Sequence, residues 1–295
     1  MTQTLLSIGE CMVEMAPQGD GTYAMGFAGD TFNTAWYAKR SAPALDIAYL
    51  SAVGDDAASA QLTDFIKTAD IRPVLSVRAG HSVGLYLISL TDGERSFSYW
   101  RDTSAARRLA ENLDGIAALG KGDMAFFSGI TLAILPDSGR ATLLDTLRAA
   151  RAKGVQIAFD PNLRPRLWSD TSTMCDWVMR GAAVSDIALP SFEDEASFFN
   201  DASPEATLVR YQNSGAALVV VKNGAAPALV GESNNRDSIA PTPVATVIDT
   251  TAAGDSFNGR FLTGLLQGET AAAATKAACQ VSARVISARG ALVDL

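Results

Sequence analysis

The stretch Val247-Ile248-Asp249-Thr250-Thr251-Ala252-Ala253-Gly254-Asp255-Ser256-Phe257-Asn258-Gly259 has the pattern of a strand end, a tight turn of small residues and the first turn of a helix. The valine and isoleucine favour a strand, and the two threonines suit the N-cap of the helix. Ala252 to Gly254 are small enough for an anion to reach the N–H groups that a helix start leaves unpaired. The stretch therefore predicts a phosphate-binding site with the Asp255 carboxylate at its mouth.

Asp255 is open to two interpretations when it is taken alone, because an acidic residue in a first turn also complements the helix dipole. The string from Thr250 to Asp255, however, resembles the second signature of the ribokinase (PfkB) family of carbohydrate kinases. The family usually has glycine where this chain has Ala252. The resemblance implies that Asp255 is the catalytic base and that the N–H groups of Ala252, Ala253, Gly254 and Asp255 bind the transferring phosphoryl group.

Composition limits the class of protein. The chain has 295 residues, of which 48% are hydrophobic and 19% are charged, and its net charge is −8. Nucleic acids and anionic membranes bind basic surfaces, so neither is an expected partner. The N-terminal segment lacks the features of a signal peptide, and no stretch is close to the length of about 20 apolar residues that a membrane span needs. The three cysteines are far apart in the sequence. We expect a cytoplasmic protein with reduced cysteines.

Strands and helices alternate along most of the chain. Expected strands at 5–9, 47–53, 124–128, 155–159, 186–189 and 217–222 are separated or followed by helices at 57–68, 137–153, 253–266 and 270–286, among others. This rhythm predicts a central, mostly parallel sheet between two helical layers, that is, a three-layer αβα fold. The whole chain, 1–295, is expected to form one ribokinase-like domain.

Two segments interrupt the rhythm and predict a small antiparallel sheet. Residues 10–15 alternate polar and apolar side chains and can pair with 22–25, while 74–77, 83–90 and 96–99 read as three strands without a helix between them, the last two joined by a turn at 91–94. In the family such a sheet, here from about 11–26 and 73–101, is a lid over the sugar. A small sheet is marginally stable unless both faces are covered, so we expect its outer face to pack against a second subunit in a homodimer or higher oligomer.

Candidate sugar-binding residues follow the small-residue turn at 26–29. Asp30 could simply cap a helix and Asn33 could be solvated, but the turn also resembles the first family signature, with Ala28 in place of one glycine. The resemblance implies sugar binding by Gly29, Asp30, Asn33, Tyr86, Tyr99, Arg101, Ile130, Arg164 and Asp255.

Candidate nucleotide-binding residues lie at the expected carboxyl ends of the later strands, where open parallel sheets bind ligands. The resemblance implies ATP as a cofactor, with Asn162, Arg164, Ser191, Lys222, Gly224, Ala253 and Gly254 around it. Arg164 could equally form a surface salt bridge. A degraded form of the family's Asn-x-x-Glu motif, Ser191-x-x-Asp194, implies that Asp194 positions Mg²⁺ through water.

Three other features carry no functional prediction. Gly115-x-x-x-x-Gly120-Lys121-Gly122 is close to a P-loop, but it follows a helical stretch and precedes a strand, so we interpret Gly120 as a helix C-cap. Gly19-x-Gly21 belongs to a turn that opens no helix. His81 is the sole histidine, and a lone histidine in a turn is usually just exposed.

Several further stretches, 9–14, 99–101, 128–135 and 164–168, resemble the sugar-acid kinases within the family. They imply ATP-dependent phosphorylation of the terminal hydroxyl of a small sugar acid of the 2-keto-3-deoxy class. Two alternatives stay open: a kinase of a neutral sugar such as fructose or ribose, and a non-catalytic protein that binds sugar and nucleotide.

Overall fold

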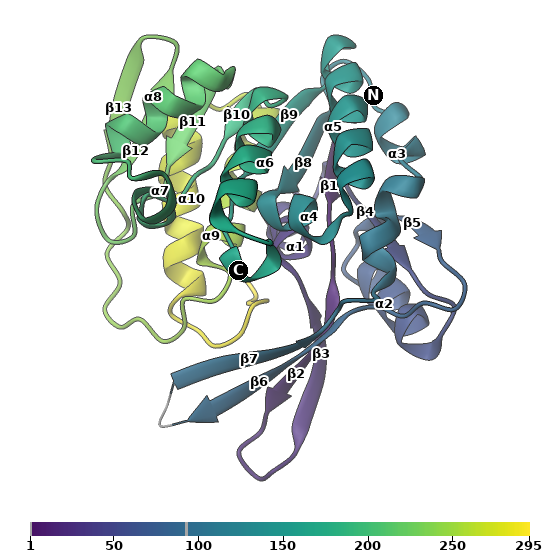
Figure 1. Ribbon diagram of the computed structural model, residues 1–295. Helices are drawn as coiled ribbons and strands as arrows, with labels where there is room; N and C mark the ends of the chain where they lie inside the picture. Colours follow the sequence, from purple (N-terminus) through teal and green to yellow (C-terminus); the bar gives the residue numbers. More distant parts are fainter. Residues whose placement is uncertain (1, 92–93) are drawn as a thin grey trace.

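In the computed structural model, which describes residues 2–91 and 94–295, the strands form one large and one small sheet (Figure 1). Asp92 and Gly93 of the expected turn at 91–94 lie outside the described residues. The large sheet has the order β13-β12-β11-β10-β9-β8-β1-β4-β5, and the small sheet has the order β3-β2-β6-β7. The predicted combination of a large, mostly parallel sheet and a small lid sheet is confirmed.

β1 (Thr4–Ile8) is the strand at which the chain order of the large sheet reverses, because it pairs in parallel with both β4 and β8. The other strands of this sheet are β4 (Asp46–Val53), β5 (Arg72–Val77), β8 (Met124–Ser128), β9 (Gln156–Asp160), β10 (Ile187–Ala188), β11 (Leu218–Val221), β12 (Ala228–Glu232) and β13 (Asn235–Ile239). Among the described strands of this sheet, the antiparallel pairs are β11–β12 and β12–β13. A ligand site is therefore expected beyond the carboxyl ends of β1 and the strands beside it.

Helices cover both faces of the large sheet because its strands are apolar on both sides. Leu5 and Tyr49 belong to one core, while Leu6 and Leu50 belong to the other. The first core is built with α1 (Asp30–Ser41), α2 (Ala57–Thr68), α9 (Ala253–Leu266) and α10 (Ala271–Val285). The second core is built with η1 (Ala105–Glu111), α3 (Asp114–Ala117), α4 (Gly129–Ile134), α5 (Asp137–Ala152), α6 (Thr171–Ala183) and α8 (Pro204–Ser214), and η2 (Pro165–Leu167) and α7 (Phe192–Phe199) adjoin it. Of the helices in the described ranges, none has the length and apolar character to cross a membrane.

The small sheet, which we call the lid, extends from one end of the layers (Figure 1). It consists of β2 (Met12–Pro17), β3 (Tyr23–Ala28), β6 (Leu85–Thr91) and β7 (Glu94–Trp100). The β2–β3 and β6–β7 pairs are antiparallel, whereas β2 and β6 are parallel. The parallel pair arises because the chain returns to the large sheet for β4 and β5 between these two strands.

The expected lid boundary at 73 is wrong. The strand predicted at 74–77 exists as β5, but it pairs in parallel with β4 at the edge of the large sheet, so the second lid segment begins at Leu85. β4, α2 and β5 form a β-α-β unit, whose crossover places the two strands side by side. The absence of a helix after this strand led to the wrong boundary. It shows that the chain enters the lid after β5, and not that β5 itself belongs to the lid.

Two further expectations are also wrong: the strand end at Val247 and Ile248, and the helix C-cap at Gly120. Val247 and Ile248 form no strand, and the two residues are 55% and 53% exposed. The Ile248 N–H donates to the carbonyl of Ile286 at the end of α10, at 2.8 Å, and not to a strand. Gly120 is not a C-cap, since α3 ends at Ala117 and Ala118 is its C-cap, and within this stretch it is Gly122 that has a positive φ, of 94°. Rejection of a P-loop is confirmed, because the stretch precedes β8 and opens no helix.

Gly29 fixes the junction between the lid and the layers. It joins β3 to α1, and a Cβ atom there would lie 2.1 Å from the carbonyl oxygen of Glu10. Only glycine lets the start of α1 lie this close to the chain segment that leaves β1. The sugar end of the expected site is therefore built on a close backbone contact.

Candidate active site

A cleft of about 1280 Å³ is bounded by the lid, the carboxyl ends of the large sheet and the start of α9. It brings together all the residues for which the sequence predicts catalysis or binding: Gly29, Asp30, Asn33, Tyr86, Tyr99, Arg101, Ile130, Asn162, Arg164, Ser191, Asp194, Lys222, Gly224, Ala252, Ala253, Gly254 and Asp255. These residues come from segments far apart in the chain. Their convergence follows from the reversal of strand order at β1, which places the carboxyl ends around one crevice.

The start of α9 forms one wall of the cleft, and its geometry differs in part from the prediction. The N-cap is Ala252, at φ 59° in the left-handed region, and no side chain caps the helix. The predicted N-cap role of the threonines is wrong, because the Thr251 hydroxyl donates to Asp249 Oδ1 at 2.7 Å. The Ala253 N–H donates to the Thr250 carbonyl at 3.2 Å. The first-turn N–H groups of Gly254 and Asp255 thus remain to bind an anion.

Asp255 has the environment of a group that exchanges a proton near neutral pH. Burial raises the pKa of its carboxyl to about 7, and the nearby carboxylates of Asp30 and Asp160 act in the same direction, while Asn33 and Lys222 oppose them. Asn33 Nδ2 donates to Asp255 Oδ2 at 2.8 Å. A pKa near the working pH is the property that suits a general base.

Asn33 is held from both sides. Its Oδ1 accepts from the Gly29 N–H at 3.3 Å, while its amide nitrogen donates to Asp255. The packing of α1 against α9 makes this contact possible. The side chain predicted to bind sugar therefore also orients the predicted base.

Lys222 lies beside the start of α9 in a network that sequence reasoning missed. Its Nζ forms an ion pair with Asp160 Oδ2 at 2.7 Å and donates to Asn258 Oδ1 at 3.3 Å, and Asn258 Nδ2 donates to Asp160 at 2.6 Å. A Cβ atom on Gly254 would lie 3.5 Å from Lys222 Nζ. The ammonium group and the helix N-terminus thus offer two positive features to one phosphate. The available signals were that Asp160 comes directly after the strand expected at 155–159 and that Asn258 lies one helical turn after Gly254.

Asp30 does not cap α1, because the N-cap is Gly29 and no side-chain cap is present. Its Oδ2 accepts from Asn162 Nδ2 at 2.9 Å, and Asn162 has an unusual positive φ of 36°. Burial raises the pKa of the Asp30 carboxyl above its ordinary value. The strained asparagine and the buried carboxylate join the loop after β9 to the start of α1.

Two guanidinium groups reach the cleft from different sides. Arg101, which follows β7, is 8% exposed and forms an ion pair with Glu10. Arg164 is half exposed, donates to the Leu163 carbonyl at 2.7 Å and lies 3.8 Å from Asp194 Oδ2. Sequence reasoning missed Glu10, whose pairing depends on the lid's return to the layers.

Asp194, in α7, is the residue predicted to position Mg²⁺. Burial raises the pKa of its carboxyl. Within the ranges that the structure describes, no three His, Cys, Asp or Glu side chains are grouped to hold a metal ion. Mg²⁺ bound to a nucleotide needs only one or two carboxylates besides the phosphate oxygens and water. Asp194, which lines the cleft, suits this role.

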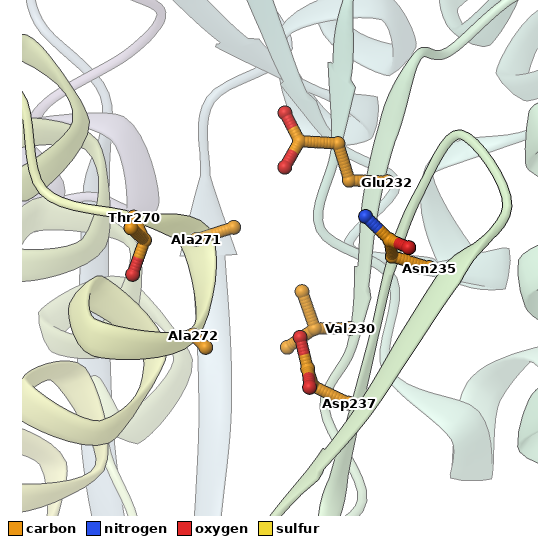
Figure 2. Close-up of a pocket in the computed structure, with 7 residues that line it drawn as sticks. All are labelled: Val230, Glu232, Asn235, Asp237, Thr270, Ala271 and Ala272. Carbon is orange, nitrogen blue, oxygen red and sulfur yellow. The ribbon is translucent and has the colours of Figure 1, made fainter.

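A second hollow, of about 330 Å³, lies between the β12–β13 hairpin and the start of α10 (Figure 2). Figure 2 shows the carboxylates of Glu232 and Asp237 on the hairpin side and Thr270 on the helix side. None of the predicted site residues lines it. Its carboxylates disfavour an anionic ligand, so the phosphate site is assigned to the large cleft.

Comparisons with known proteins agree with this geometry. The model of the pfkB family of carbohydrate kinases matches residues 2–295. The chain is 35% identical to the 2-dehydro-3-deoxygluconokinase of Haemophilus influenzae, with 97% of this chain and 94% of the relative covered. It is 37% identical to that of Dickeya dadantii, with 100% and 98% covered.

Solved structures of sugar kinases share the fold. Fructokinase from Vibrio cholerae O395 with fructose, ADP and calcium bound has a TM-score of 0.85 at 25% identity, covering 99% of this chain and 96% of that one. Aminoimidazole riboside kinase from Salmonella enterica, complexed with aminoimidazole riboside and an ATP analogue, has a TM-score of 0.86 at 21% identity, with the same coverage. With a full-length family match and relatives above 30% identity, the chain belongs to the pfkB family of carbohydrate kinases.

Proposed function

We propose that this kinase transfers the terminal phosphoryl group of ATP to the terminal (6-) hydroxyl of 2-keto-3-deoxygluconate. The observation that carries the proposal is a buried arginine, Arg101, lining the cleft of a chain whose net charge is −8. A sugar acid differs from a neutral sugar by its carboxylate, for which the planar guanidinium fork is suited. The near full-length relatives named 2-dehydro-3-deoxygluconokinase support the same substrate class.

The proposed chemistry is in-line phosphoryl transfer at the start of α9. Asp255 accepts the proton of the attacking hydroxyl, and Asn33 holds its carboxylate in place. The N–H groups of Gly254 and Asp255, together with Lys222, stabilise negative charge on the phosphoryl group. Bound Mg²⁺, held by Asp194 through water, would neutralise charge on the nucleotide phosphates.

The proposed ATP site runs along Asn162, Arg164, Ser191, Lys222, Gly224, Ala253 and Gly254. Its supports are the lining of the cleft and the nucleotide-bound structures of the fructokinase and the riboside kinase. We place the enzyme in the cytoplasm as a single ribokinase-like domain with its lid. The three free cysteines, two of them buried, suit a reducing compartment.

The substrate assignment predicts the outcome of a coupled assay of ADP release across sugars and sugar acids. With ATP and Mg²⁺, 2-keto-3-deoxygluconate should have a higher kcat/KM than fructose or ribose, because only the sugar acid can pair with the arginines. Better use of a neutral sugar would replace this assignment with a neutral-sugar kinase. Absence of ADP release with every compound would favour a non-catalytic binding protein.

Removing either arginine should weaken binding of the sugar acid. Arg101→Ala or Arg164→Ala should raise its KM at least about tenfold, since a hydrogen bond to a charged group contributes roughly 1.5 to 3 kcal/mol. The KM for ATP should change far less for Arg101→Ala. Arg72→Ala is the control, because Arg72 lies on the edge strand β5, pairs with Asp46 of β4 and does not line the cleft. Unchanged sugar-acid KM values in both variants would contradict the proposed carboxylate site.

The raised pKa of Asp255 predicts an acid limb in the pH profile of kcat/KM. The protonated carboxyl cannot accept a proton, so kcat/KM should fall as the pH falls through about 7. Asp255→Asn should keep the fold and ATP binding but lower turnover by about 10² to 10⁴. Near-normal turnover in this variant would refute the assignment of the base.

Asp30→Asn provides the sharper form of this experiment. It removes a negative neighbour, so the pKa of Asp255 should decrease and the acid limb should move to lower pH. Asp102→Asn is the matched control, because Asp102 is a carboxylate elsewhere on the cleft wall. A limb that stays in place in Asp30→Asn would show that another group produces it.

The register of the lid supports a homodimer formed through its outer face. Met25 pairs with Met15 and Trp100 pairs with Leu85, so these side chains lie on the face opposite Tyr86. Met25 is 50% exposed and Trp100 is 60% exposed. Such an apolar face is typical of an interaction surface.

Light scattering at micromolar concentration should therefore give a mass of at least twice the chain's 30.9 kDa. Met25→Glu should reduce the mass to that of the monomer, because it buries a charge in the proposed interface. Val209→Glu changes an exposed valine on α8 and should leave the mass unchanged. A monomeric wild-type protein would overturn the dimer.

A further inference from the structure

Glu10 and Arg101 form an ion pair at the two places where the lid begins and ends. Glu10 lies between β1 and β2, and Arg101 follows the last residue of β7. Both side chains line the cleft, yet that of Glu10 is only 1% exposed and that of Arg101 only 8%. Charges are rarely removed from water to this extent without a specific reason, because their desolvation is unfavourable.

The pair leaves two buried polar atoms unused. Glu10 Oε2 accepts from Arg101 Nη2, whereas Glu10 Oε1 and Arg101 Nε have no hydrogen-bond partner in the part of the chain that the structure describes. Buried polar atoms are normally satisfied, so these two mark a network that is completed by another group. A bound sugar acid brings both an acceptor and hydroxyl donors to this end of the cleft.

Two glycines make room for the pair. A Cβ atom on Gly84 would lie 2.8 Å from Glu10 Oε1 and 3.2 Å from Arg101 Cβ, and one on Gly29 would lie 2.1 Å from the Glu10 carbonyl oxygen. Glu10 is thus enclosed by backbone on both sides and has little freedom to move. It provides a fixed point against which a long, flexible arginine side chain can be held.

From this arrangement we infer that Glu10 is a positioning residue, which holds the Arg101 guanidinium so that its remaining N–H groups bind the carboxylate of the sugar acid. The inference rests on the proposed function. Glu10 acts only through Arg101 and takes no part in phosphoryl transfer. Because the pair joins the first and last crossings of the lid, it also holds the lid in the orientation that closes the sugar end of the cleft.

A double-mutant cycle tests this role. Glu10→Gln keeps the shape and an acceptor but removes the charge. It should raise the KM for 2-keto-3-deoxygluconate about three- to tenfold, less than Arg101→Ala does, because the guanidinium is still present but is held less firmly. The values of kcat and of the KM for ATP should change less than about twofold. In an Arg101→Ala background, Glu10→Gln should change the sugar-acid KM by less than about twofold, because no guanidinium is left to position.

Matched variants separate positioning from a general loss of structure. Asp46→Asn breaks the exposed pair with Arg72 and should leave all constants unchanged. Gly84→Ala should reproduce the effect of Glu10→Gln by displacing the carboxylate, whereas Gly26→Ala in β3 should be silent, since its nearest neighbour would be Glu14 Oε1 at 3.9 Å. Should Glu10→Gln fail to fold, Gly84→Ala decides the outcome.

The inference is overturned if folded Glu10→Gln keeps the wild-type sugar-acid KM or lowers it. It is also overturned if the effects of Glu10→Gln and Arg101→Ala multiply, because Glu10 would then act independently. These results differ from a failure of the proposed function, which the wild-type protein alone would show by preferring a neutral sugar. Wild-type use of the sugar acid with a silent Glu10→Gln would reject the positioning role alone.

Discussion

The contact between the start of α9 and α1 is the constraint on which the site depends. It places the Asp255 carboxylate beside Asn33 and near Asp30 and Asp160, in a cleft whose floor carries more negative than positive charge. Asn33 and Lys222 offset the negative neighbours of Asp255, and Lys222 and Asn258 contact the Asp160 carboxylate. Lys222 is also one of the groups that we propose to stabilise the phosphoryl group.

The lid adds a second constraint, because its four strands come from two separated segments that leave and rejoin the layers beside β1. Gly29 and Gly84 allow backbone to approach Glu10 closely at these crossings. The lid side of the cleft is consequently built at positions where a side chain larger than that of glycine would clash with Glu10. The residues that attach the lid to the layers are therefore also those that shape this side of the cleft.

Local sequence patterns predicted the layers, because strand-turn-helix units carry their own signals. The family resemblance supplied the residues that converge on the cleft. The local patterns failed where the outcome depends on a distant partner. β5 lies in the large sheet because it pairs in parallel with β4 at the sheet edge. Val247 lies in no strand and is 55% exposed. Thr251 turned to Asp249 instead of capping α9. Glu10 and Asn258 lie in stretches that the sequence singles out, but their roles could not be predicted there, since they arise from contacts with the distant Arg101 and Asp160.

A crystal structure with 2-keto-3-deoxygluconate and a non-hydrolysable ATP analogue tests the central claim most directly. The terminal hydroxyl should lie within hydrogen-bond distance of Asp255, between it and the terminal phosphate at the start of α9, with the sugar carboxylate on Arg101. A sugar acid bound with its hydroxyl away from Asp255, or a nucleotide bound away from α9, would contradict the claim.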